Sequence, residues 1–247
     1  MSLRKINEIK PLIHCITNYV VANFTANGLL AIGASPVMAD AIEEAAEMAS
    51  KANALLLNIG TLNERTIESM KAAGQSANEH HVPIVLDPVG AGATTYRSHI
   101  TLALLQQLKV NLIRCNMGEL AAIAGVSWQA KGVDSGSGEI DVVQTAKMIA
   151  KTYNCLVIVT GEQDVLTDGH KVELIAGGHE KITKVTGSGC LLSAICAAML
   201  ASSTEPFEDL THLLHEYKQV SELAYDRIGT LHENFLNHLE QFAEGRI

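Results

Sequence analysis

Short apolar runs alternate along the chain with longer segments in which hydrophobic positions recur at helical spacing. The runs are rich in Leu, Ile and Val and lack the in-and-out alternation of a half-exposed strand, which is typical of parallel strands covered on both faces. Strand followed by helix, repeated, predicts a doubly wound α/β fold with right-handed crossovers. The predicted strands are 12–17, 54–60, 83–87, 111–116 and 155–161, and the predicted helices include 41–51, 63–80, 116–124 and 141–152.

The pattern changes after the fifth predicted strand. Two short extended segments flank Asp168-Gly169, a dipeptide favoured in type I′ hairpins, so we expect an antiparallel hairpin at one edge of the sheet. The stretch from Cys190 to about Ser202 is apolar nearly all round and predicts a helix buried on most sides. Amphipathic helices are predicted near 206–228 and 230–243, and the Gly- and Ser-rich segment 131–139 is expected to be a mobile surface loop.

Composition narrows the class of protein. Hydrophobic residues make up 47% of the 247 residues but aromatic residues only 4%, so the core must consist of closely packed aliphatic side chains, which suits helices on a parallel sheet. No repeat or long linker interrupts the pattern, and we expect a single domain over residues 1–247. The formal net charge of -9 argues against a nucleic-acid partner.

Two further patterns in the sequence bear on the cellular location of the protein and on the role of its cysteines. The N-terminal segment lacks the apolar core of a signal peptide, and no apolar run reaches about 18 residues, so we expect a cytoplasmic protein without membrane contact. The five cysteines contain no C-x-x-C pair, which argues against a zinc site or a redox pair.

Polar and glycine-rich residues follow each of the five predicted strands. Ligands of open parallel α/β sheets bind beyond the carboxyl ends of the strands, where these tails would lie. Each tail alone could simply end its strand, because turns favour Asn, Asp and Gly, but five together favour a binding site. The tails are T-N-Y (17–19) with Asn23 beyond it, N-I-G-T (58–61), D-P-V-G-A-G-A (87–93), R-C-N-M-G-E (114–119) and T-G-E (160–162).

The segment V-T-G-S-G-C (185–190) directly precedes the predicted buried helix. Gly187 and Gly189 would let the backbone approach a ligand, and the successive amides from Gly187 through Ser188 to Cys190 would form an anion site at the helix N-terminus. It is not a Walker A loop, because no Lys-Ser or Lys-Thr follows, nor a dinucleotide fingerprint, because residue 192 is Leu. The alternative is a plain loop before a helix.

Three charged residues in the strand tails could complete a phosphate site. Asp87 and Glu119 offer the hard oxygen ligands that suit Mg²⁺. Arg114 belongs to a predicted buried strand, where a charge is unfavourable unless it meets an anion or a carboxylate. Taken singly, Asp87 could be a turn residue and Glu119 a solvated helix residue.

Six segments together resemble the hydroxyethylthiazole kinase family, thiamine-salvage enzymes of the ribokinase-like superfamily. They span most of the chain in one order, and the last 40 or so residues match less distinctly. The segments are HCITNYVVANFTANGLLAIGASPVMAD (14–40), ALLLNIGTL (54–62), VLDPVGAGAT (85–94), IRCNMGELAAIAG (113–125), VIVTGEQD (157–164) and VTGSGCLLSA (185–194).

The resemblance implies a ribokinase-like three-layer α/β/α sandwich that transfers phosphate from ATP to 4-methyl-5-(2-hydroxyethyl)thiazole with Mg²⁺. It also implies a homotrimer with thiazole sites between subunits. Carried over residue by residue, the resemblance places Met38 and Gly187 at the thiazole, and Arg114 and Thr160 at the nucleotide phosphates. It places Asp87 and Glu119 at Mg²⁺ and its waters. The backbone amides of Gly187, Ser188, Gly189 and Cys190 would surround the transferring group.

Cys190 stands where related sugar kinases carry an aspartate base. A helix N-terminus can lower the pKa of a thiol, whereas an anionic nucleotide nearby would raise it again. Phosphoryl transfer passes through a loose transition state, so positioning and charge neutralisation contribute more to the rate than early proton removal. We therefore predict a secondary role for Cys190.

Three other functions are compatible with parts of the pattern. A kinase for another vitamin alcohol, such as hydroxymethylpyrimidine, would keep the same phosphate loop. A catalytically silent nucleotide-binding protein could keep Arg114 and the loop, although the presence of both Asp87 and Glu119 speaks against it. A dinucleotide-dependent oxidoreductase should carry the first-turn glycine fingerprint, which is missing.

Overall fold

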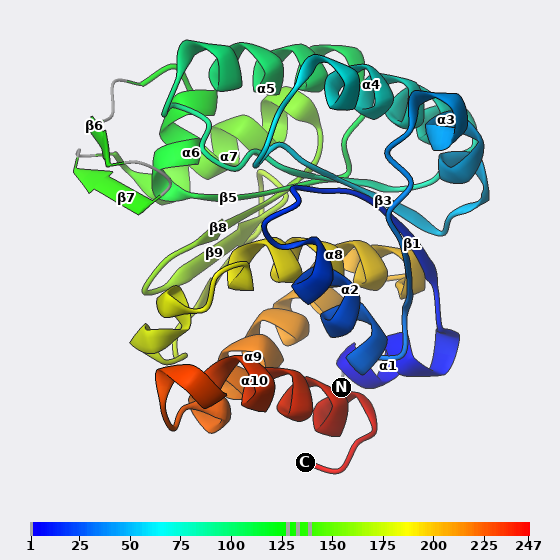
Figure 1. Ribbon diagram of the computed structural model, residues 1–247. Coiled ribbons are helices and arrows are strands. Elements are labelled where there is room, and N and C mark those ends of the chain that lie inside the picture. The colour runs from blue at the N-terminus through cyan, green and yellow to red at the C-terminus, as the bar shows by residue number, and fades with distance from the viewer. Residues whose placement is uncertain (1, 127–128, 132–133, 138–139) are drawn as a thin grey trace.

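A single eight-stranded sheet forms the middle of the fold in the computed structural model, which describes residues 2–126, 129–131, 134–137 and 140–247 (Figure 1). In order across the sheet, its strands are β10 (Val172–Ile175), β9 (Asp164–Thr167), β8 (Leu156–Thr160), β5 (Leu112–Asn116), β4 (Ile84–Asp87), β3 (Ala54–Asn58), β1 (Leu12–Ile16) and β2 (Ser35–Val37). The strands from β8 to β2 run parallel, and β9 pairs antiparallel with both of its neighbours, β8 and β10. The predicted parallel sheet with an antiparallel edge is confirmed.

Helices cover both faces of the sheet and give the predicted three-layer sandwich (Figure 1). One layer contains α3 (Ile42–Lys51), α4 (Glu64–Glu79), α5 (Thr95–Gln107), α6 (Met117–Ile123) and α7 (Val142–Tyr153). The other contains α1 (Ser2–Ile9), α2 (Ala22–Ala31), α8 (Ser188–Ser202), α9 (Pro206–Ala224) and α10 (Ile228–Ala243), with the 3-10 helix η1 (Glu180–Lys184) ahead of α8.

The strands are apolar without alternation because both faces of the sheet are buried. In β3, Ala54 and Leu56 pack into the core on the side of α8, whereas Leu55 and Leu57 pack into the core on the side of α4. All four are fully buried, and each buried leucine contributes about 1.5–3 kcal/mol relative to an exposed one. The two hydrophobic cores therefore hold the strand ends, and the loops beyond them, in fixed positions.

Helix α8 is buried on most sides, as its composition predicts, and packs against β3, β4 and α2. A Cβ on Gly28 of α2 would lie 2.3 Å from Leu191 Cδ1, so only glycine permits this close approach. The first turn of α8 lies at the carboxyl ends of the strands, where Gly189 meets Arg114 of β5 and Cys190 meets Asn18 beyond β1.

The two ends of the chain meet in the layer that contains α8 (Figure 1). The carboxylate of Glu216 in α9 accepts hydrogen bonds from the backbone amides of Ser2 (2.8 Å) and Leu3 (2.9 Å), which caps the N-terminus of α1. Lys5 Nζ adds an ion pair to Asp209 Oδ2 at 2.6 Å. Helix α1 is thus fixed to a helix that lies more than 200 residues later.

The hairpin between β9 and β10 has a different turn from the one expected. Thr167 pairs with Val172, so four residues separate the strands. Asp168 Oδ1 accepts hydrogen bonds from the amides of His170 and Lys171, both at 2.7 Å. Gly169 has a positive φ of 92°, but Asp168 does not, and a type I′ turn requires both. The predicted antiparallel hairpin is confirmed, but its turn is wider than the type I′ turn that Asp-Gly favours, because the aspartate side chain organises it.

Segment 131–139 was expected to be a surface loop, but part of it is paired strand. Residues of β6 (Gln129–Lys131) and β7 (Asp134–Ser137) form an antiparallel pair, while 132–133 and 138–139 lie outside the described residues. The last two helices also differ in extent, since α9 ends at Ala224 and α10 begins at Ile228. In the part of the chain that the structure describes, no helix is both long and apolar enough to cross a lipid bilayer.

Candidate active site

Asp87, the last residue of β4, is fully buried at the carboxyl edge of the sheet. Its Oδ2 accepts a hydrogen bond from Asn58 Nδ2 at 2.7 Å. Its Oδ1 lies 3.7 Å from Arg114 Nη1 and accepts no hydrogen bond from the described residues. Burial raises the pKa of Asp87, and the charge of Arg114 opposes that rise. One carboxylate oxygen is held in place, and the other has free acceptor capacity.

Arg114 joins the charged strand ends to the glycine loop. Its guanidinium reaches Asp87 on one side and donates a hydrogen bond from Nη2 to Thr160 Oγ1 at the end of β8 on the other. A Cβ on Gly189 would lie 2.7 Å from Arg114 Nη1, so the glycine is what lets the arginine approach the first turn of α8. Burial alone would lower the pKa of Arg114, but the charges of Asp87 and Glu119 outweigh it and raise the pKa.

Glu119 is buried, and the interpretation as a solvated helix residue is wrong. Its Oε1 accepts from the amide of Gly90 (2.9 Å) and its Oε2 from the amide of Asn116 (2.8 Å), while Asn116 Oδ1 caps the amide of Glu119 in return. This capping box begins α6 and ties it to the loop after β4. Burial, aided by the charge of Asp87, raises the pKa of Glu119 to about 7.

The charges around Asp87 fit a bound cation. Two buried carboxylates, those of Asp87 and Glu119, face one guanidinium, that of Arg114, and Asp87 Oδ1 has no hydrogen-bond donor among the described residues. No group of three or more His, Cys, Asp or Glu side chains in the described residues forms a metal cage. A cation here would take most of its ligands from water and phosphate, a preference typical of Mg²⁺.

The glycine loop has the geometry of an anion site, except that the backbone amide of Ser188 is already hydrogen-bonded within the protein. Gly187 is the N-cap of α8, with a φ of 92° that glycine adopts readily, and a Cβ there would lie 2.8 Å from Val21 Cγ1. The amide of Ser188 donates to the carbonyl of Val185 at 3.2 Å. The first-turn amides of Gly189 and Cys190 lack partners within the helix and are the ones suited to an anion.

Cys190 sits in the first turn of α8 as a buried, protonated thiol. Asn18 Nδ2 donates a hydrogen bond to its Sγ at 3.6 Å. Burial raises the pKa of Cys190 to about 12, and the charge of Asp87 adds to that rise. The helix N-terminus, which could have lowered the pKa, is outweighed by burial and by the nearby carboxylate.

Two asparagines that sequence reasoning left without a role complete the buried cluster. Asn58 Oδ1 accepts hydrogen bonds from Asn18 Nδ2 (2.9 Å) and from the amide of Gly60 (3.0 Å), while its Nδ2 donates to Asp87. Both asparagines belong to the polar tails, Asn18 to 17–19 and Asn58 to 58–61, and that position was the signal in the sequence. A continuous chain of side chains therefore leads from Cys190 through Asn18 and Asn58 to Asp87.

Arg97 in the first turn of α5 ties together two of the strand tails. Its Nη1 donates to the carbonyls of Ile59 (3.0 Å) and Val89 (2.6 Å), and its Nη2 donates to the carbonyl of Gly60 (2.7 Å). These carbonyls belong to the loops after β3 and β4, which carry Asn58 and Asp87. Arg97 lies in no tail or motif, so only the folded structure identifies this contact.

Met38 lies apart from the charged cluster, directly after β2. Three strand spacings, or about 14 Å, separate β2 from β4. Met38 is half-buried against the core that contains Leu191 of α8. The segment is anchored by His14, whose Nε2 donates to the carbonyl of Ala39 at 2.7 Å. Met38, directly after β2, and Thr160, at the end of β8, thus lie far apart along the carboxyl edge of the sheet.

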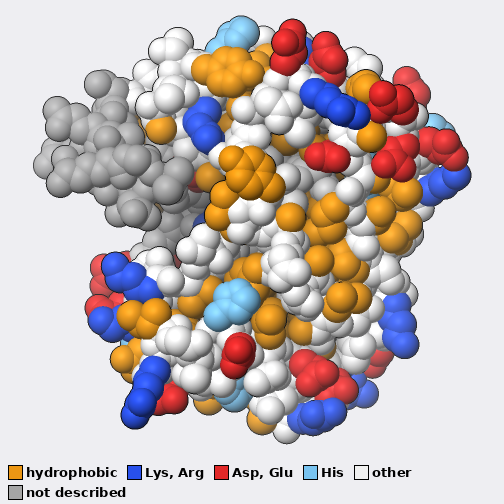
Figure 2. Space-filling view, viewed as in Figure 1, with side chains coloured by type: hydrophobic (Ala, Val, Ile, Leu, Met, Phe, Trp, Pro, Cys, Tyr) orange, Lys and Arg blue, Asp and Glu red, His pale blue; other side chains and the backbone are white. Residues whose placement is uncertain are grey.

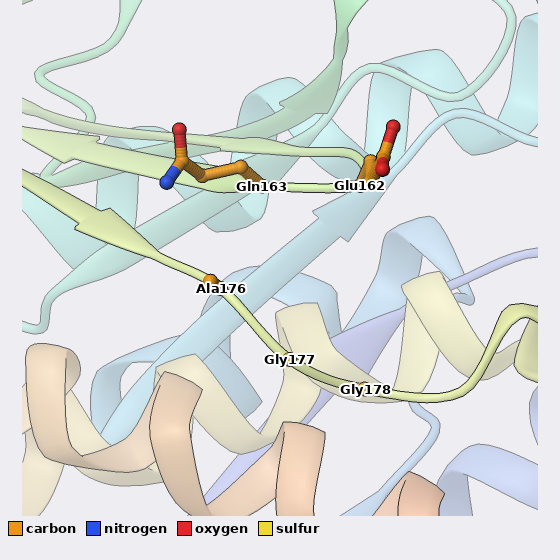
Figure 3. A pocket seen from close by; sticks show the side chains of 5 residues that line it. All are labelled: Glu162, Gln163, Ala176, Gly177 and Gly178. Atoms are coloured by element: carbon orange, nitrogen blue, oxygen red, sulfur yellow. The ribbon is translucent and has the colours of Figure 1, made fainter.

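A hollow of about 610 Å³ begins two residues beyond Thr160 in the chain (Figure 3). Glu162 and Gln163 line it from the turn between β8 and β9, and Ala176, Gly177 and Gly178 line it from the segment after β10. Lys218 of α9 pairs with Asp164 Oδ1 at 3.2 Å, and Asp164 Oδ1 also accepts from the amide of Gly161 at 2.9 Å. The turn that forms the hollow is therefore held by a buried ion pair.

Large hydrophobic side chains are exposed in and just before α2. Tyr19 is 81% exposed, Val20 62% and Leu30 59%, and all three lie in or just before α2. Figure 2 shows hydrophobic side chains gathered across the middle of the face that carries α2. Exposed apolar groups of this size are typical of a surface that contacts another molecule.

Known proteins match this chain over nearly its full length. The Hydroxyethylthiazole kinase family matches residues 3–244. A relative from Lysinibacillus sphaericus (strain C3-41), named hydroxyethylthiazole kinase, is 53% identical over 247 residues, which cover 99% of this chain and 97% of the relative.

Solved structures agree in fold. The structure of a hydroxyethylthiazole kinase protein from Pyrococcus horikoshii OT3 has a TM-score of 0.88 and 40% identity, covering 97% of this chain and 91% of that one. A ribokinase-like superfamily protein from Enterococcus faecalis V583 has a TM-score of 0.66 at 10% identity, covering 97% and 89%, which confirms the ribokinase-like fold. The chain belongs to the hydroxyethylthiazole kinase family.

Proposed function

We propose that this protein transfers the γ-phosphoryl group of ATP to the hydroxyl group of 4-methyl-5-(2-hydroxyethyl)thiazole, in thiamine biosynthesis or salvage, and that residues 1–247 act as one kinase domain. Family membership supports the reaction and the acceptor. The observation that carries the proposal is the approach of Arg114 to Gly189, which brings a guanidinium, two helix amides and Asp87 around one point. Such a group neutralises and orients a transferring phosphoryl group.

The two substrates would occupy opposite ends of the carboxyl edge. Arg114 and Thr160 would bind nucleotide phosphates, and the hollow beyond Glu162 is large enough for the adenosine part. Met38 and Gly187 would contact the thiazole, with the hydroxyl group directed toward the first turn of α8. The amides of Gly189 and Cys190 would hold the transferring group.

Asp87 and Glu119 would hold Mg²⁺ and its waters, with Asp87 offering the unpartnered Oδ1. When bound, Mg²⁺ would neutralise phosphate charge. Cys190 would have a secondary role, because a thiol with a pKa of about 12 is a poor base at neutral pH.

We further propose a cytoplasmic homotrimer. The five cysteines are free, which suits a reducing compartment. Exposed Tyr19 and Val20 directly precede Val21, which lies against Gly187 at the proposed thiazole end. A second subunit could cover them, together with exposed Leu30, and complete the pocket. Sedimentation equilibrium tests the assembly, and a Tyr19→Asp variant should sediment as a smaller species.

The reaction is tested by measuring ADP formation with ATP, Mg²⁺ and the thiazole alcohol. ADP should form only when all three are present, and hydroxymethylpyrimidine should neither replace the thiazole nor compete with it. Absence of thiazole stimulation would refute the acceptor, and strong phosphorylation of the pyrimidine would favour the alternative kinase.

A further inference from the structure

We propose that Asn58 is a positioning residue that fixes the orientation of the Asp87 carboxylate and so presents Asp87 Oδ1 to the metal-bound nucleotide. The inference rests on the proposed function, because it assigns Asp87 to the metal and the phosphates. Asn58 is the last residue of β3, and its side chain lies beside that of Asp87 on the neighbouring strand.

The partners of Asn58 determine which way its amide faces. The backbone amide of Gly60 can only donate, and it lies 3.0 Å from Asn58 Oδ1. The Nδ2 group must therefore face Asp87 Oδ2, which can accept, at 2.7 Å. If the Asn58 amide were reversed, its NH₂ group would face the N–H group of Gly60, and its oxygen would face Asp87 Oδ2. Neither pair could form a hydrogen bond, so these partners fix the orientation of the amide.

This hydrogen bond acts on the rotation of the Asp87 side chain. The terminal torsion of an aspartate is broad, so an unsupported carboxylate can rotate and exchange its two oxygens. A donor to one oxygen of an anionic carboxylate forms a strong, short hydrogen bond that holds the group in place. Asn58 is only 1% exposed, so water does not compete for either partner. With Oδ2 held, Oδ1 stays directed toward Arg114.

Asn58 also connects the metal side of the site to the acceptor side. Its Oδ1 accepts from Asn18 Nδ2 at 2.9 Å, and the same Nδ2 donates to Cys190 Sγ at 3.6 Å. The carboxylate that would meet the metal is therefore positioned relative to the helix turn that would meet the alcohol. An unlinked Asp87 would keep its charge but lose this alignment.

Asn58→Ala and Asn58→Leu test the inference, because both remove the donor without adding charge, and Leu keeps the branched shape and the number of side-chain heavy atoms. The matched control is Asn111→Ala. Asn111 Oδ1 accepts from the amide of Ile84 at 2.9 Å, so it also supports β4, but at the opposite end of that strand. Thermal unfolding identifies the variants that fold.

The decisive measurement is ATP affinity by calorimetry, with MgCl₂ and with EDTA, in the absence of thiazole. In folded Asn58 variants, the ratio of the ATP affinity with MgCl₂ to the ATP affinity with EDTA should be at least tenfold smaller than in the wild type. The ATP affinity measured with EDTA should stay within threefold of the wild-type value. In the kinase assay, kcat should fall at least tenfold and the KM for the thiazole should change less than threefold. Asn111→Ala should keep wild-type values for all of these.

The inference would be overturned if Mg²⁺ increased the ATP affinity of a folded Asn58 variant as much as it does in the wild type. It would also be overturned if the variant lost the same amount of ATP affinity with and without Mg²⁺, because that result indicates a site that is less ordered as a whole. The calorimetry needs no acceptor. A wild-type protein that binds ATP with Mg²⁺ but ignores the thiazole therefore refutes the proposed acceptor, while the Asn58 comparison still decides the positioning role.

Discussion

The contact between Gly189 and Arg114 makes Gly189→Ala a sharp test of the phosphate site. The new Cβ would lie 2.7 and 2.8 Å from the two terminal nitrogens of Arg114, and ordinary contacts begin at 3.4 Å. The guanidinium would have to move by about 0.7 Å, away from the position in which it meets both Asp87 and Thr160. Misplacement of about 1 Å can reduce the rate about 100-fold.

We expect kcat for thiazole phosphorylation to fall roughly 10- to 100-fold, or about 1.4–2.7 kcal/mol in activation free energy. Stability should not fall in parallel. Alanine is favoured over glycine inside a helix by up to about 1 kcal/mol, which offsets strain from the displaced arginine. The measurements are steady-state ADP formation and thermal unfolding of the same preparations.

Gly229→Ala is the matched control. Gly229 is the second residue of α10, just as Gly189 is the second residue of α8, but a Cβ at Gly229 would meet no atom within 4 Å. This variant should keep wild-type turnover. The reasoning is refuted if Gly189→Ala keeps kcat within twofold of wild type, or if Gly229→Ala loses as much activity.

Three further outcomes are expected. Cys190→Ser should reduce kcat by less than about tenfold, whereas EDTA should abolish ADP formation. The reason is that phosphoryl transfer depends more on charge neutralisation than on proton removal. If Cys190→Ser abolished ADP formation as completely as EDTA does, Cys190 would have an essential role. Glu216→Ala should lower the free energy of unfolding in urea by about 1–3 kcal/mol, because the amides of Ser2 and Leu3 lose their acceptor, with turnover unchanged in the folded protein. Arg97→Lys should lower kcat/KM for the thiazole about tenfold, because a single ammonium nitrogen cannot occupy the positions of both Nη1 and Nη2, from which Arg97 reaches the two loops. Unchanged kinetics would show that the loops hold their positions without Arg97.

The hydrophobic pattern predicted the strands that are long and buried. It did not predict short strands whose extended form depends only on pairing with a neighbouring strand. The five apolar runs all became parallel strands of the sheet. Strand β2 has only three residues, Ser35–Val37, and none of them is fully buried, so no apolar run marks it. Its extended form depends on pairing with β1, which lies more than 20 residues earlier in the chain.

The candidate site was predictable as a set of strand ends, but not as a set of contacts. The tails identified Asp87, Arg114 and Glu119, because the carboxyl edge of a parallel sheet gathers them, and the glycines before the buried helix identified the loop 185–190. The role of Asn58 depends on β3 lying between β1 and β4, an order that spacing along the chain does not reveal. Arg97 depends on three backbone carbonyls, which have no sequence signature at all.

The capping of α1 by Glu216 implies an order of assembly. The layer of α3 to α7 comes from one continuous stretch, residues 42–153, and can form while the rest of the chain is still being made. The layer that holds α8 joins Ser2 to Glu216 across 214 residues, and contacts that close such long loops form late. The glycine loop at Gly187–Cys190 would therefore gain its final surroundings only when the chain is almost complete, so an unfinished chain would have most of the sheet but not the packed first turn of α8.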